Sequence, residues 1–193
     1  MKGLLSLMIL LSAAGYTAAA EEYSIDAAHT QVGFSVKHMV IATVRGHFKE
    51  FSGTVFYDEI DITRSRIEGV IKTASIYTDN EQRDEHLRTS DFFDAAQYPE
   101  IRYKSKKILK RNDEWVAVGD LTIRGVTREV ELTFTVSEPI VDPYGNARIG
   151  VEARGKINRQ DFGVAWSKKL DSGGLVVGDE VKLELAGEFI KKK

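Results

Sequence analysis

Apolar and polar residues alternate along most of this chain, and a period of two is typical of half-buried β-strands. The alternation is clearest over 129–136, 147–157 and 181–189. Another strand is predicted where one face carries Val32, Phe34, Val36 and His38. Less regular strands are predicted over 47–57, 65–77, 100–108 and 114–123. The chain is therefore expected to be mainly β, with about eight strands.

Eight antiparallel strands can close into a barrel or pack as the two sheets of a sandwich. Closure removes the exposed sheet edges that promote aggregation, and an eight-stranded barrel is large enough to hold one small ligand. Ala153 and Gly155 lie on the apolar face of the 147–157 strand, where small residues would leave space inside a barrel. The period of two also fits a sandwich core, so the pattern alone leaves both architectures open.

One segment interrupts the strand pattern and is predicted to be helical. Thr78 and Glu81 have the spacing of a capping box, which begins a helix. The helix is expected over 80–96, with Ser90 as a candidate second cap. Tight turns are predicted between strands at Arg124-Gly125 and at 143–146.

The first twenty residues have the three-part order of a secretory signal peptide. Lys2 gives a positive start, residues 3–15 form a short apolar run, and alanines at 18–20 precede Glu21. This segment would direct export of the protein from the cytoplasm and would be cleaved after Ala20. Residues 21–193 show no linker or internal repeat and are expected to form one domain. A buried N-terminal helix is the alternative interpretation of the apolar run.

The composition excludes several classes of protein. The 27 Lys and Arg residues nearly balance the 29 Asp and Glu residues, giving a formal net charge of −2. Nucleic-acid-binding domains usually carry a strongly basic surface, so no nucleic-acid partner is expected. The chain contains no cysteine. It therefore forms no disulfide, zinc–thiolate site, iron–sulfur cluster or catalytic thiol.

Titratable residues support two further hypotheses. His29, His38 and His47 are nine residues apart, and a hairpin could bring them together as metal ligands, although this spacing is not a known ligand signature. A hydrogen-bonded core histidine is the alternative for His38. The cluster at 83–87 could support acid–base chemistry, or it could be a charged helix surface anchored by Leu87. The sequence shows neither a Gly-x-Ser-x-Gly elbow nor a phosphate-binding glycine motif.

An ordered series of short motifs runs through nearly all of residues 23–189. The motifs lie at 26–30, 32–39, 45–48, 51–53, 83–87, 90–94, 98–99, 119–127 and 158–164. Each is weak alone, but together and in this order they are highly specific. On them the chain resembles the YceI-like family of secreted polyisoprenoid-binding proteins.

The resemblance implies an extended lipocalin-like barrel of eight antiparallel β-strands with a helical insertion. It implies a long tunnel for an isoprenoid chain or a similar amphiphile, with no cofactor and no established reaction. Because the histidine spacing lacks a ligand signature and the chain has no thiolate, binding is expected to need no metal. The resemblance also implies a periplasmic location for the exported chain and allows a homodimer. The expected partners are a long-chain apolar lipid, a second copy of the chain and, transiently, a membrane.

The leading hypothesis is a periplasmic carrier that sequesters a polyisoprenoid, an isoprenoid quinone or a fatty-acid-like lipid. Burial of each CH₂ group contributes roughly 0.8 kcal/mol, which an apolar barrel interior can supply. An enzyme acting on such a lipid and a structural or stress-protective protein with incidental lipid are the alternatives. Residues expected to line the tunnel or its mouth are Phe34, Val36, His38, Arg45, Phe48, Phe51, Arg83, Leu87, Phe92, Phe93 and Trp166. Trp166 could instead plug one end of the barrel.

Overall fold

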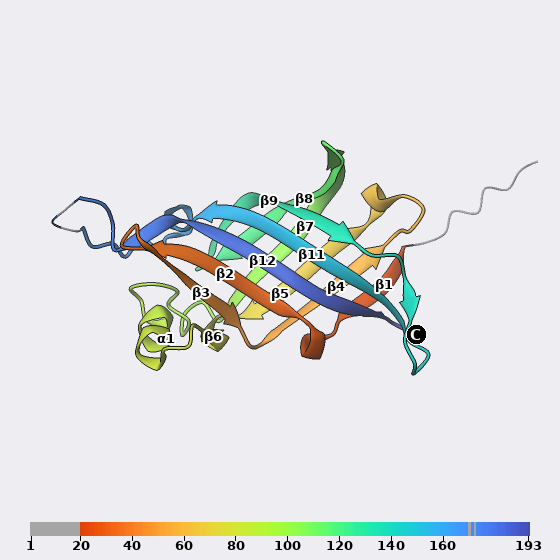
Figure 1. Cartoon of the computed structure of the whole chain (residues 1–193), viewed down its shortest axis with the longest axis horizontal. Helices are drawn as coiled ribbons and strands as arrows, with labels where there is room; N and C mark the ends of the chain where they lie inside the picture. The colour runs from red at the N-terminus through yellow and green to blue at the C-terminus, as the bar shows by residue number, and fades with distance from the viewer. Residues whose placement is uncertain (1–19, 170, 172) are drawn as a thin grey trace, which may run out of the picture.

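A computed structural model describes residues 20–169, 171 and 173–193, so the predicted signal peptide lies outside the described residues except for Ala20. The strands of this part form one antiparallel sheet, and eight of them close into an elongated barrel (Figure 1). Closure occurs because β11 pairs with β12 as well as with β9. The barrel strands are β1 (Glu21–Ile25), β4 (Phe51–Tyr57), β5 (Arg66–Lys72), β7 (Glu100–Arg111), β8 (Glu114–Ile123), β9 (Val126–Val136), β11 (Ala147–Asn158) and β12 (Val177–Lys191).

The period of two in the sequence is the cause of this architecture. In β9, Val130 and Phe134 are buried, whereas Glu129 and Glu131 between them are exposed. Arg124 and Gly125 both have positive φ, 50° and 73°, and form the two-residue turn that joins β8 to β9. The eight-stranded barrel and this turn are confirmed, as is the turn within 143–146.

Four further strands extend the sheet beyond the barrel: β2 (Gln31–His38), β3 (Ala42–Phe48), β6 (Ile76–Tyr77) and β10 (Ile140–Val141). β1 and β2 pair with different parts of the same edge of β12. The turn η1 (Ala27–His29) connects them and brings Thr30 against Gly187. A Cβ at Gly187 would lie 2.2 Å from the Thr30 hydroxyl, so this close approach requires glycine.

Two predicted strands are wrong in extent. The strand expected over 47–57 is divided at Lys49 and Glu50 into the end of β3 and β4. The amides of these two residues donate hydrogen bonds to Ser75 instead of to a neighbouring strand. The strand expected over 65–77 is interrupted by η3 (Thr73–Ser75), where the Thr73 amide donates to Pro99. β1 and most of β3 were not predicted, because neither segment shows a clear alternation in the sequence.

The helical insertion is shorter than the sequence predicts. Helix α1 spans Glu81–Arg88, and Asn80 is its N-cap, with the side chain accepting from the Arg83 amide at 2.9 Å. The predicted capping box is therefore wrong: the Thr78 hydroxyl donates to Asp84 at 2.5 Å instead. Beyond Thr89 the chain folds back in turns rather than continuing as helix to 96. In the part of the chain that the structure describes, no helix meets the length and hydropathy needed to span a membrane.

Candidate functional site

The barrel encloses an apolar cavity of about 240 Å³. This is far more than the roughly 10–15 Å³ that one water molecule needs. Its lining comes from all eight barrel strands, from β2 and β3, and from the insertion. Apolar side chains that line it include Val32, Ile71, Leu121, Leu132, Ile157, Leu183 and Leu185.

One end of the cavity is closed by packed core. Val55 and Phe189 line the cavity here, and beyond them lie Tyr23, Tyr57 and Ile149. These three side chains are buried, and the two tyrosine rings meet edge to face at 6.2 Å. A long apolar chain could not extend past this end without displacing core side chains.

The opposite end, which we call the hairpin end, is bounded by Val36 of β2 and Val177 of β12. The insertion covers it, with Leu87, Phe92 and Phe93 lining the cavity. The rings of Phe93 and Phe48 pack edge to face, with their centroids 6.4 Å apart. This contact holds the insertion against β3.

Two glycines widen the cavity in the middle of its wall. Gly53 of β4 and Gly69 of β5 are directly paired, and both line the cavity. Tyr103, the partner of Gly69 on β7, also lines it. A Cβ added at Gly69 would meet only the Ser52 carbonyl oxygen, at 3.8 Å. The glycine pair therefore leaves space that side chains fill elsewhere on the wall.

Two polar side chains that reach the lining have their hydrogen-bonding groups occupied. The Tyr103 hydroxyl donates to the Ala117 carbonyl at 2.9 Å, and burial raises the pKa of Tyr103. Arg159 is 4% exposed, and desolvation lowers its pKa. Its guanidinium donates to the carbonyls of Val164, Trp166, Val177 and Gly178 and to the carboxylate of Asp179. Neither group is free to bind a polar ligand.

The residues singled out from the sequence divide into two groups. Seven line the cavity: Phe34, Val36, Phe48, Phe51, Leu87, Phe92 and Phe93. Four are outside the lining: His38, Arg45, Arg83 and Trp166. The second group contains every polar residue proposed to meet a head group.

Local pairing explains the positions of these four. Arg45 lies opposite Ser35 on β2, one residue out of phase with the inward-facing Phe34 and Val36. Arg83 turns back to bind the Thr78 hydroxyl and carbonyl.

Trp166 packs behind the lining. The centroid of its ring lies 5.3 Å from that of Phe92 and 5.6 Å from that of His86. His38 lies beyond Val36, paired with Val177 at the hairpin end.

Sequence reasoning did not single out Gly53, Gly69, Tyr103 or Arg159. A signal for Tyr103 was present, because it has the same period-two phase as the buried Ile101. Arg159 lies within the 158–164 motif. Gly53 likewise lies within the 51–53 motif, whereas Gly69 gave no signal, and only strand register makes the two glycines partners.

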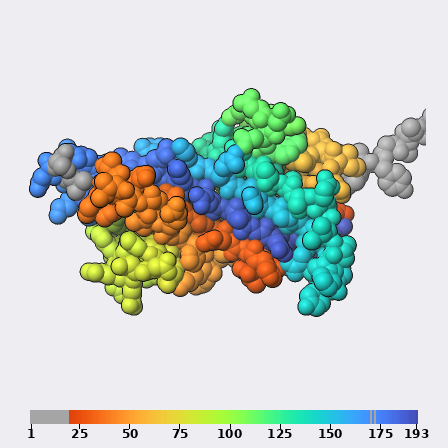
Figure 2. Space-filling model, in the orientation of Figure 1, coloured from red at the N-terminus to blue at the C-terminus, as the bar shows by residue number. Residues whose placement is uncertain are grey.

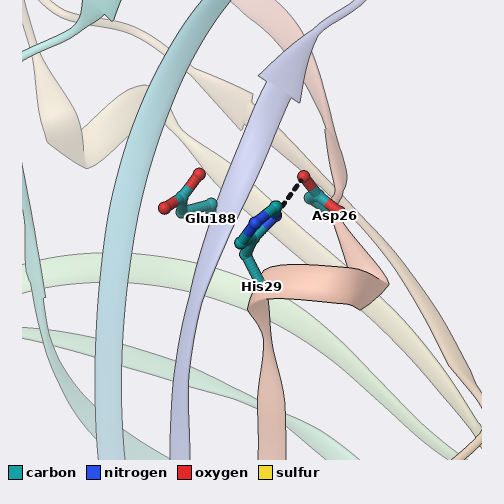
Figure 3. A group of neighbouring side chains, drawn as sticks. All are labelled: Asp26, His29 and Glu188. Atoms are coloured by element: carbon teal, nitrogen blue, oxygen red, sulfur yellow. Dashed lines mark hydrogen bonds and ion pairs between the residues drawn. The ribbon is translucent and has the colours of Figure 1, made fainter. Parts of the chain in front are cut away.

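A charged cluster lies on the outside of the barrel, where Asp26, His29 and Glu188 place potential metal-ligand atoms within 4.8 Å of one another (Figure 3). His29 Nδ1 is 2.9 Å from Asp26 Oδ2. Arg148 Nη1 donates to Asp26 at 2.7 Å and to Glu188 at 2.9 Å, and Arg148 Nε donates to Asp142 at 2.8 Å. The guanidinium therefore already neutralises the carboxylates that a cation would need.

The comparisons with known proteins agree with this geometry. A model of the YceI-like domain matches residues 23–189. The chain belongs to the YceI-like family. Protein YceI of Escherichia coli O157:H7 is 36% identical over 186 residues, covering 95% of this chain and 94% of that protein.

Solved structures show the same fold. The YceI protein of Campylobacter jejuni is 34% identical, with a TM-score of 0.70, and the match covers 88% of this chain and 97% of that one. BcnA of Burkholderia cenocepacia is 24% identical, with a TM-score of 0.75 and coverages of 85% and 98%. A polyisoprenoid-binding domain from Saccharophagus degradans is 15% identical, with a TM-score of 0.64 and coverages of 90% and 99%.

Treatment of this YceI-like protein with a strong chelator is expected to leave its melting temperature and its retained ligand unchanged. Arg148 occupies the carboxylates beside His29. His47 lies opposite Gly33, five residues along β2 from His38, so the two histidines are far apart on opposite faces. Calorimetry before and after chelation would test this. A fall in melting temperature that one divalent metal restores would contradict it.

The same cluster makes the barrel sensitive to strong acid. The hydrogen bond from Arg148, followed by that from His29, lowers the pKa of Asp26 from 3.8 to about 2. A carboxyl with a lowered folded-state pKa stabilises the fold above pH 3.8, and this contribution is lost as the pH falls through about 2. Thermal unfolding across this range should show the loss, and Arg148→Gln should reduce it. An equal acid response in both proteins would contradict this origin.

Proposed function

We propose that this protein is a periplasmic carrier that sequesters the apolar chain of a long-chain lipid inside its barrel. The observation that carries the proposal is the cavity of about 240 Å³, closed at one end and lined by apolar side chains of every barrel strand. An apolar cavity of this kind excludes water. Burial of each CH₂ group of a ligand in it contributes roughly 0.8 kcal/mol to the binding free energy.

The chemistry of the lining favours a ligand whose buried part is hydrocarbon. Tyr103 and Arg159 donate their hydrogen bonds within the protein, so a polar head group would leave its own groups unpaired inside. We therefore expect the head group to remain at the hairpin end, near His38. A polyisoprenoid, an isoprenoid quinone and a fatty-acid-like lipid all meet this requirement. The polyisoprenoid-binding domain that shares the fold favours the first.

Binding without turnover is the expected activity. The titratable residues considered for catalysis, His38 and the 83–86 cluster, do not line the cavity. Arg83 is bound to Thr78, and His86 Nε2 lies 2.9 Å from the Asp91 carboxylate. A lipid held between apolar walls would be out of reach of these groups.

Native mass spectrometry of the purified mature protein, followed by lipid extraction, tests this function. A bound species of defined mass that extracts into organic solvent and is chemically unchanged on incubation would support a carrier. Protein free of lipid, and unable to take it up from mixed lipid extracts, would contradict it. The intact mass also tests export, since a periplasmic product should begin at Glu21.

A further inference from the structure

The turn between β2 and β3 carries three consecutive exposed apolar side chains. Met39, Val40 and Ile41 are 41%, 66% and 86% exposed. Single exposed apolar residues are common on soluble proteins, whereas a contiguous group at the end of a hairpin indicates an interaction surface. We call residues 39–41 the apolar tip.

The backbone of the apolar tip does not favour these residue types. Met39 has φ 49° and Val40 has φ 66°, the left-handed region that favours Gly, Asn and Asp. A β-branched residue such as valine is unfavourable there. The tip therefore carries exposed apolar side chains where polar turn residues would be both more soluble and less strained. This combination points to a function for the apolar side chains.

The apolar tip adjoins the hairpin end of the cavity. Val36 and Val177 line that end. Val177 pairs with His38, the last residue of β2 before the tip. The Met39 amide donates to the Val176 carbonyl at 2.9 Å, which ties the tip to the segment preceding β12. Figures 1 and 2 show the β2–β3 turn and this segment together at one end of the long axis, on the same side as α1.

Three exposed lysines lie close to the tip. Lys37, Lys168 and Lys169 are exposed, and in the described part of the chain none of them is in an ion pair. Asp171 is the acidic residue of the same segment. Lysines beside an apolar tip can meet anionic lipid head groups while the apolar side chains enter the interface.

We propose that the apolar tip inserts into the surface of an anionic lipid bilayer and holds the hairpin end of the cavity against it. The inference rests on the proposed lipid-carrier function, because docking at this end would place the cavity where its ligand is exchanged. A lipid surface suits three residues better than a protein does, since stable protein interfaces bury about 800 Å² on each partner.

Single-cysteine labelling can identify the end that meets the membrane, because the chain contains no other cysteine. Ile41→Cys at the tip and Ile140→Cys near the opposite end, both exposed isoleucines, would each carry a nitrobenzoxadiazole fluorophore. Vesicles of phosphatidylcholine and phosphatidylglycerol should brighten and blue-shift the probe at position 41 only. No change at 41, or an equal change at 140, would overturn the proposal.

Flotation with the same vesicles tests the side chain itself. Val40→Asn removes the apolar group and suits the positive φ, so it should keep or raise the melting temperature while lowering the bound fraction about tenfold. Val141→Asn is the matched control, since Val141 is similarly exposed at the other end, and it should bind normally. Binding to phosphatidylcholine alone should be weaker, and salt should reduce binding to the anionic vesicles.

The two proposals fail in different ways. Lipid in the purified protein with no vesicle binding would overturn membrane docking and keep the carrier function. Vesicle binding by a protein that never contains lipid would overturn the carrier function and leave the docking surface. A dimer that Val40→Asn dissociates, with no vesicle binding, would identify a second copy as the occupant and overturn the membrane proposal.

Discussion

Replacing Gly69 by leucine is expected to empty the barrel of its lipid while leaving the barrel folded. Gly69 lines the cavity opposite Gly53, and only the Ser52 carbonyl oxygen lies within 4 Å of an added Cβ. The leucine side chain would occupy the space proposed for the ligand. Glycine is unfavourable within a strand, so the substitution should not lower the melting temperature. We expect retained lipid to fall about tenfold or more, since overpacking a filled interior costs about 1–3 kcal/mol.

Gly150→Leu is the matched control for this prediction. Gly150 lies in β11 between the buried Ile149 and Val151, so its side chain would point outward. An added Cβ there makes only ordinary contacts with Ser137, at 3.6 and 3.8 Å. Native mass spectrometry and thermal unfolding of both variants would decide. Normal lipid content in Gly69→Leu, or equal loss in both variants, would contradict a ligand site in the cavity.

A graded series strengthens this experiment. Gly69→Ala, Gly69→Val and Gly69→Leu add increasing volume at one point of the wall, and retained lipid should decrease in that order. Val36→Trp fills the hairpin end instead and should have the same effect. A large loss of stability in these variants, with no lipid in the parent protein, would mean that the lining is ordinary core.

Removal of the Arg159 guanidinium is expected to cost about 3–5 kcal/mol of folding stability, the range for breaking a buried charged pair. Arg159 is 4% exposed and donates to four carbonyls and the Asp179 carboxylate. In Arg159→Met the four carbonyls would lose this donor and Asp179 would keep the hydrogen bond from Gln160. The carbonyls of Val164 and Trp166 would then have to bind water. Chemical denaturation would measure the loss. Hydrogen exchange should accelerate in the amides that follow Phe162.

Arg154→Met provides the comparison for Arg159→Met. Arg154 is exposed and pairs with Glu114 on the barrel surface, where an ion pair contributes little. Its replacement should leave the denaturation midpoint nearly unchanged. If Arg159→Met were equally mild, the segment between η4 (Arg159–Phe162) and β12 would have to be held by its other contacts.

The sequence predicted much of the cavity wall because side-chain direction in a strand is local. Period-two alternation placed Phe34 and Val36 on one face, and both line the cavity. The same rule could have shown that Arg45 points away from the cavity. The face on which Arg45 lies, however, depends on how β3 pairs with β2. Local pattern also misjudged the insertion, since Thr78 fits a capping box and yet binds the buried Asp84. A residue's neighbours in space, which the sequence does not give, decided both cases.

By itself the sequence determined a β-rich chain with a helical insertion, tight turns and the motif order of the YceI-like family, because each depends on residues close together in the chain. Only the tertiary structure decided that β12 pairs with β11 on one edge and with β1 and β2 on the other. That pairing closes the barrel and puts the apolar tip beside the cavity, while the register of β4 against β5 sets Gly53 opposite Gly69. Such contacts join residues that are distant in sequence, so they exist only once the whole sheet has formed.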